Sequence, residues 1–174
     1  MKLFGRVFLV SILAASLRVA EASPLEVSQV LPSAQRVGEA HYRVLAWTVF
    51  EAALWADGGV FSWDRPFALT LTYRRSFSAQ ALTNRTLGEM SRRSASNAET
   101  LAPLRERLHA CFPDVTPGDR ITGVSTGANS ARFYFNGRQR CEIEWPGFRR
   151  GFFGIWLDAN GVERAQSARL RGSS

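Results

Sequence analysis

The run His41-Tyr42-Arg43 brings together three side chains that could do acid–base chemistry. If this run is part of a β-strand, His41 and Arg43 share one face, because side chains alternate between the faces of a strand. A histidine beside an arginine can act as a general base near neutral pH. We therefore take these three residues as candidate catalytic groups. The alternative is an ordinary pair of polar side chains on an exposed strand face, which is the more common arrangement.

The two cysteines of the chain, Cys111 and Cys141, permit one disulfide in an oxidising compartment. The alternative is two separate buried thiols, and the sequence does not decide between them. The run His109-Ala110-Cys111 lacks the spacing of a metal site, and the other histidine is distant in sequence. We therefore expect neither a metal nor a cofactor.

Several common kinds of catalytic site are not predicted by this sequence. We find no catalytic triad, no paired carboxylates and no glycine-rich phosphate loop. Lys2 is the only lysine, so a chain cleaved after its N-terminal segment could hold no Schiff-base or Walker lysine. The formal net charge of +7 could suggest nucleic-acid binding, but the arginines are scattered as singles and pairs. We favour a basic solvated surface, with weak contact to anionic membrane surfaces as a further hypothesis.

The N-terminal segment has the layout of a secretory signal peptide. Basic residues precede an uncharged run over 7–17, and Ala20-Glu21-Ala22 gives a small-x-small cleavage pattern. The run is too short to span a bilayer, and no other run is long enough. We predict a signal peptide over 1–22 and a periplasmic or secreted monomer. An uncleaved anchor is the alternative.

The elements that would position these residues follow the order of an α+β domain: strands, two helices, a run of three strands and a short aromatic helix. The segment 37–55 predicts two strands joined by a turn. Residues 67–73 alternate between apolar and smaller or polar side chains, which predicts a half-buried strand. Ser78 is placed as a helix N-cap. We predict helices over about 79–93 and 101–111.

Three more strands are predicted over 120–126, 130–135 and 138–145. Asn136-Gly137 between the last two is typical of a β-hairpin. A two-residue loop would place Arg132 opposite Cys141 and mix the two faces. A three-residue loop with Gly137 in the left-handed region places Ala131 opposite Cys141 and keeps one face apolar. We therefore predict the three-residue loop.

The segment 148–158 is rich in aromatic residues. Its large apolar side chains recur at helical spacing and form two adjacent stripes: Phe148, Phe152 and Trp156, with Phe153 and Leu157 beside them. Arg149 and Arg150 fall on the other side. A helix this apolar must be nearly surrounded, either within an ordinary core or beside a cavity that holds an apolar molecule.

Five stretches, in this order, resemble the bacterial chalcone isomerase-like family: VGEAHYRVLAWTVFEAALW, LTYRRSFSAQAL, CFPDVTPGDRITG, FYFNGR and PGFRRGFFGIWLD. The resemblance covers about residues 29–160. It implies a large antiparallel sheet with helices packed on one face, an open-faced β-sandwich with a cleft between the layers. We assign this domain to 23–165 and expect 166–174 to be a loose tail. The superfamily includes plant isomerases, which close a chalcone into a flavanone, and fatty-acid-binding relatives.

The resemblance also locates the polar groups of the plant isomerases, which stabilise developing negative charge on oxygen. Their arginine falls in a stretch that matches Gly38 to Arg43, where a one-residue shift brings Arg43 into place. Their threonine, tyrosine and asparagine fall on Phe50, Leu82 and Glu89. Because three polar positions are lost, we do not expect chalcone cyclisation.

An apolar cleft with one internal arginine suits a ligand that has a long apolar tail and a carboxylate, because the arginine can bind the carboxylate. We therefore expect a non-catalytic binder of a small apolar or amphipathic molecule, such as a fatty acid. The expected ligand contacts are Arg43, Phe50, Leu82, Phe152 and Trp156. One alternative is an isomerase (an intramolecular lyase) that acts on another substrate. A second is an interaction protein of the cell envelope that uses its arginine-rich surface.

Overall fold

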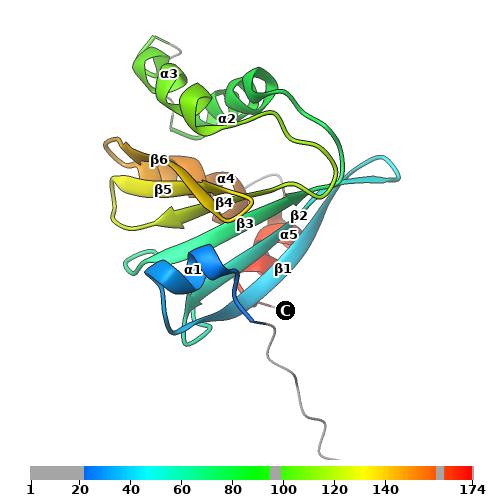
Figure 1. Cartoon of the computed structure of the whole chain (residues 1–174), viewed down its shortest axis with the longest axis vertical. Helices are drawn as coiled ribbons and strands as arrows, with labels where there is room; N and C mark the ends of the chain where they lie inside the picture. The colour runs from blue at the N-terminus through cyan, green and yellow to red at the C-terminus, as the bar shows by residue number, and fades with distance from the viewer. Residues whose placement is uncertain (1–21, 95–98, 160–162, 174) are drawn as a thin grey trace, which may run out of the picture.

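The computed structural model describes residues 22–94, 99–159 and 163–173. The predicted signal peptide, apart from Ala22, lies outside the described residues. One antiparallel sheet of six strands, side by side in sequence order, forms the frame (Figure 1). Its strands are β1 (Ala34–Val44), β2 (Trp47–Asp57), β3 (Phe67–Tyr73), β4 (Arg120–Ser125), β5 (Ser130–Phe135) and β6 (Arg138–Glu144).

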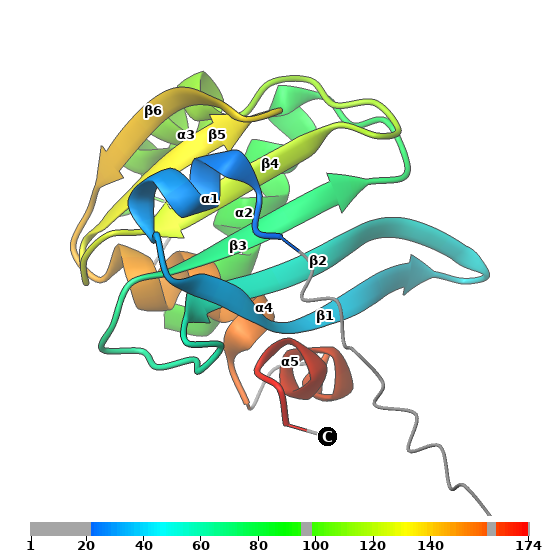
Figure 2. The ribbon, with the colours of Figure 1, turned by 60° about the horizontal axis from the view of Figure 1, so that its bottom comes forward.

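The helices are distributed unequally over the two faces of the sheet. They are α1 (Leu25–Val30), α2 (Ala79–Ser94), α3 (Ala102–Cys111), the π-helical turn η1 (Arg149–Phe153), α4 (Gly154–Leu157) and α5 (Arg164–Leu170). The helices α2, α3 and α4 lie over one face, here called the inner face (Figures 1 and 2). The short α1 crosses the opposite, outer face, and α5 packs beside β1. The predicted α+β architecture is confirmed.

Strand β3 is buried on both faces, where the sequence predicts a half-buried strand. The predicted apolar face is correct, because its four residues are all buried on the inner face: Phe67, Leu69, Leu71 and Tyr73. The predicted exposure of the other face is wrong, because Ala68 and Thr70 are also buried. The cause is α1, which the sequence does not predict. Its Val27, together with Leu31, packs on Trp55 and Ala68.

Helix α1 is held to the outer face by a buried carboxylate. The side chain of Glu26 is only 1% exposed and accepts hydrogen bonds from Arg120 Nε at 2.9 Å and Thr122 Oγ1 at 2.8 Å. A buried charge is tolerated only when it is paired and hydrogen-bonded. This arrangement fixes α1 against β4.

Helix α2 begins where the sequence predicts. Ser78 Oγ accepts a hydrogen bond from the Ala81 N–H at 3.1 Å, so the predicted N-cap is confirmed. Asp114, which precedes β4, accepts another from the Ala79 N–H at 2.7 Å. Two of the four free N–H groups of the first turn are thereby satisfied, and the start of α2 is fixed relative to the sheet.

The hairpin between β5 and β6 turns in two residues, Asn136-Gly137, where the sequence predicts three. Both have positive φ, 47° and 84°, as in a type I′ turn. The extra residue lies further along β6, where Arg140 has no partner in β5, as in a β-bulge. The bulge places Phe133 opposite Cys141 and keeps the inner face apolar. The predicted face was therefore right, but the predicted loop and the predicted partner of Cys141 were wrong.

The aromatic segment forms the predicted stripe. The rings of Phe148 and Phe152 stack with centroids 5.1 Å apart, and Trp156 follows 5.3 Å from Phe152. The position of Arg149 differs from the prediction, because this side chain is buried and donates to Ser125 Oγ and to the Trp63 carbonyl. The reason is its spacing, because Arg149 precedes Phe153 by four residues and Trp156 by seven, so even an α-helix places it among the apolar side chains.

The predicted loose tail from residue 166 is wrong over most of its length. Helix α5 continues to Leu170, whose side chain is fully buried, and Ser167 Oγ donates to the Trp156 carbonyl. A Cβ atom added to Gly38 in β1 would lie 2.0 Å from the Arg169 carbonyl oxygen. Glycine at position 38 therefore lets the backbone of α5 rest directly on the sheet.

A disulfide joins Cys111 at the end of α3 to Cys141 in β6, with the two Cα atoms 5.5 Å apart. The separation of the Cα atoms is typical of a disulfide. The bond ties α3 to the far edge of the sheet. Of the two arrangements that the sequence left open, the structure has the bridged one.

We expect reduction of this disulfide to lower the free energy of unfolding by about 3 kcal/mol, because the bond closes a loop of 30 residues in the unfolded chain. Urea unfolding with and without dithiothreitol measures the effect. The double variant Cys111→Ala, Cys141→Ala is the control and should not respond to the reductant. Free thiols that alkylate without reduction, in protein folded under oxidising conditions, would contradict the bridge.

Candidate functional site

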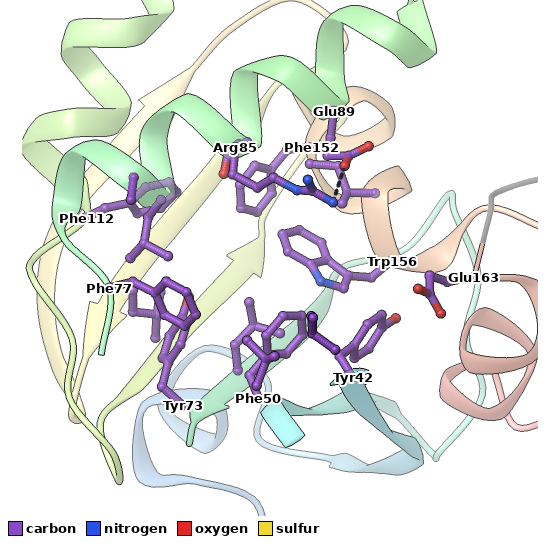
Figure 3. Close-up of a pocket in the computed structure, with 18 of the residues that line it drawn as sticks. Tyr42, Phe50, Tyr73, Phe77, Arg85, Glu89, Phe112, Phe152, Trp156 and Glu163 are labelled. Carbon is purple, nitrogen blue, oxygen red and sulfur yellow. Dashed lines mark ion pairs between the residues drawn. The ribbon is translucent and has the colours of Figure 1, made fainter. Parts of the chain in front are cut away.

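A cavity of about 800 Å³ lies between the inner face of the sheet and the helices α2, η1 and α4 (Figure 3). Its wall is mostly apolar and includes Phe50, Leu71 and Ile121 from the sheet. From the helices it includes Leu82 and Trp156. The volume lies within the range of about 300–1,000 Å³ that is typical of small-molecule sites. The aromatic segment therefore packs as a core on one side and borders an open space on the other.

All the residues that the sequence predicts as ligand contacts border this one cavity: Arg43, Phe50, Leu82, Phe152 and Trp156. They come from β1, β2, α2, η1 and α4, which are far apart in sequence. Whether they contact a ligand remains a prediction.

The three candidate catalytic residues do not act as one group. Tyr42 points into the cavity and is buried. His41 lies on the outer face, where its Nδ1 atom is 3.5 Å from Glu51 Oε1. Successive residues of β1 alternate between the faces of the sheet, so Tyr42 and His41 cannot both reach one substrate. His41 is an exposed side chain beside Glu51, and no contact given by the structure joins it to Arg43.

Arg43 differs from the predicted internal arginine. Its side chain is exposed at the rim of the cavity, and it has no ion pair or hydrogen bond with the described residues. Arg43 pairs with Thr48, whereas Tyr42 pairs with Phe50, so Val49 is an extra residue at this point of β2. This irregularity and the nearby end of the hairpin place Arg43 at the opening rather than inside.

Helix α2 supplies two further cations at the rim, which the sequence analysis missed. Arg85 Nη2 lies 2.9 Å from Glu89 Oε1, and Arg92 pairs with the same carboxylate. All three residues border the cavity, and Figure 3 shows Arg85 and Glu89 there. Their spacing of four and three residues, which places them on one side of a helix, was a signal that could have located them.

Two buried tyrosines, Tyr42 and Tyr73, border the cavity. The hydroxyl of Tyr42 is buried without a hydrogen-bond partner among the described residues. Burial, and then the negative charge of Glu163, raise the pKa of Tyr42 above its ordinary value, and burial alone raises the pKa of Tyr73. Figure 3 shows the Tyr42 hydroxyl directed towards Glu163. Both hydroxyls therefore stay protonated at neutral pH and can donate to an oxygen atom.

The described residues contain no group of three or more His, Cys, Asp or Glu side chains that could hold a metal ion. Within the same ranges, no helix is both long enough and apolar enough to cross a membrane.

Comparison with known proteins identifies the fold and the family. A family model described as chalcone isomerase-like matches residues 57–170, more than half of the chain. Comparison with curated protein sequences finds no match. The crystal structure of a fatty-acid-binding protein from Arabidopsis thaliana matches with a TM-score of 0.64 and 8% sequence identity, over 80% of this chain and 87% of that chain. At this identity the structural likeness concerns the fold alone. From the family match and the shared fold, we conclude that the chain belongs to the chalcone isomerase-like family.

Proposed function

We propose that this protein binds a fatty acid or a related amphipathic molecule in the cavity between the sheet and α2. The observation that carries the proposal is the cavity itself, which has an apolar interior and a rim that includes Arg43, Arg85 and Arg92. An apolar tail inside the cavity would remove hydrocarbon surface from water. A carboxylate at the rim would meet guanidinium groups, which bind carboxylates well. The Arabidopsis protein of the same fold is named as a fatty-acid-binding protein, which supports this choice of ligand.

The positions that carry polar catalytic groups in plant isomerases support a role without chalcone cyclisation. In this chain they hold Phe50, Leu82 and Glu89, and all three border the cavity. Two of them are apolar, and the third is a carboxylate already paired with arginines. The side chains of Phe50 and Leu82 have no donor for a developing oxyanion, and that of Glu89 is engaged by Arg85 and Arg92.

We further propose that the protein is exported. The N-terminal signal pattern and the Cys111–Cys141 disulfide both support an oxidising compartment such as the periplasm.

A second candidate function is an isomerase acting on another substrate, and the Tyr42 and Tyr73 hydroxyls favour it. Two protonated donors in a cavity with a mostly apolar wall could stabilise an enolate. A chiral product that accumulates with time, and that the Tyr42→Phe variant does not form, would support this candidate.

Native mass spectrometry of protein purified under mild conditions tests the binding function. We expect a co-purifying mass of lipid size, and at least a tenfold weaker binding of added palmitate in the double variant Arg85→Gln, Arg92→Gln. Arg138→Gln is the control, because Arg138 is exposed but does not border the cavity. An empty protein that also fails to take up palmitate would refute the proposal.

A further inference from the structure

The tip of the β1–β2 hairpin exposes large apolar side chains. Among the described residues, five large apolar side chains are exposed, and three of them lie at this tip: Val44 (63%), Leu45 (92%) and Trp47 (63%). Leu45 has a φ of 55°, a conformation that L residues rarely adopt outside turns. Figure 2 shows the hairpin projecting past the other strands and clear of the helices.

The side chains around this tip are mainly cationic. The guanidinium carbon of Arg75 lies 4.7 Å from the centre of the Trp47 ring, and Arg43 is exposed on the same hairpin. Arg74 forms an ion pair with Glu51, with Nη2 and Oε2 2.7 Å apart. Of these three arginines, only Arg74 is paired with a carboxylate among the described residues. An exposed tryptophan and leucine beside arginines is the combination that favours the interface of an anionic bilayer.

The same hairpin also forms part of the cavity opening, because Arg43 and Val44 border the cavity. A surface that holds the tip would therefore also lie next to the opening. An apolar ligand could then pass between a bilayer and the cavity with little exposure of its hydrocarbon to water.

We propose that the hairpin tip, formed by Val44, Leu45 and Trp47 with Arg43 and Arg75, inserts shallowly into the surface of anionic membranes. The docking itself depends on the exposure and charge of the tip. The transfer of a ligand at the docked site rests on the proposed function. Without residues 1–22, which carry Lys2, Arg6, Arg18 and Glu21, the formal net charge falls from +7 to about +5, and this charge adds a general attraction to the same surface.

Vesicles of two parts phosphatidylcholine to one part phosphatidylglycerol, with pure phosphatidylcholine vesicles for comparison, test the docking. At low ionic strength we expect the mature chain to sediment with the anionic vesicles and to lose most binding as salt is raised. Leu45→Glu should weaken this binding about tenfold or more, because the bilayer no longer buries the apolar surface of a leucine at this position. Leu25→Glu is the matched control, because Leu25 is 71% exposed but lies on α1, away from the tip. It should bind like the wild-type protein.

Equal binding of Leu45→Glu and wild type, or equal binding to neutral and anionic vesicles, would overturn the docking. A dimer that Leu45→Glu dissociates, with no vesicle binding, would assign the tip to a second copy of the chain and would also overturn it. Palmitate binding without vesicles separates the two proposals. Leu45→Glu should still bind palmitate. A wild-type protein that does not bind palmitate would refute the proposed function but not the membrane docking.

Discussion

The Ala81→Trp variant is expected to bind a fluorescent fatty acid at least about tenfold more weakly than the wild-type protein. Ala81 borders the cavity from the first turn of α2, and its own side chain is exposed. A large ring at this position can therefore enter the space that the ligand would occupy without compressing the core. A fluorescence titration with a fixed protein concentration measures the change in Kd.

Gln80→Trp is the matched control for this variant. Gln80 precedes Ala81 on the same turn and is exposed, but it does not border the cavity. Both variants add the same ring at neighbouring positions, so a difference in helix propensity cannot explain a difference in Kd. Equal affinity of Ala81→Trp and the wild-type protein would mean that the ligand lies elsewhere.

The Gly38→Ala variant is expected to lower the free energy of unfolding by about 3 kcal/mol or more. The added Cβ atom would lie 2.0 Å from the Arg169 carbonyl oxygen and 2.8 Å from that of Leu170. Both contacts are with backbone atoms, which cannot rotate away as a flexible side chain can. Helix α5 must therefore move off β1, and the buried side chain of Leu170 would lose its packing. Urea unfolding gives the free energy, and limited proteolysis shows whether α5 detaches.

The control for this stability change is Gly88→Ala. Gly88 lies inside α2, and a Cβ atom added there would meet nothing within 4 Å. Alanine favours a helix by about 0.8–1 kcal/mol over glycine, so this variant should be slightly more stable than the wild-type protein. If Gly38→Ala unfolds at the same urea concentration as the wild type, the close packing of α5 on β1 is wrong.

The inner face of the sheet could be predicted because the alternation of large apolar residues in 67–73 and 130–135 fixes which side chains point together. The family resemblance then supplied the arrangement of the layers. Helix α1 could not be predicted in this way. Its six residues are too few to show a helical repeat, and its role depends on Glu26 meeting Arg120 and Thr122 from a distant strand.

Other differences have similar causes. A two-residue loop followed by a bulge at Arg140 gives the same alternation of faces as a three-residue loop. The pattern alone therefore cannot distinguish the two arrangements. The burial of Arg149 depends on acceptors from distant segments, Ser125 Oγ and the Trp63 carbonyl, which helical spacing does not show. Five residues around the cavity, Arg43, Phe50, Leu82, Phe152 and Trp156, could be named from the sequence, but the sequence does not give the distance between sheet and helices. That distance decides whether Trp156 borders a space or closes it.

A crystal of the mature protein grown with a fatty acid brominated near the end of its tail tests the central claim most directly. The anomalous signal of bromine should lie inside the cavity, near Phe50, Leu82 and Trp156, which border it. The carboxylate should lie at the rim, within reach of Arg43, Arg85 or Arg92. Bromine found only on the outer surface, with the cavity unchanged at a saturating concentration, would contradict the account.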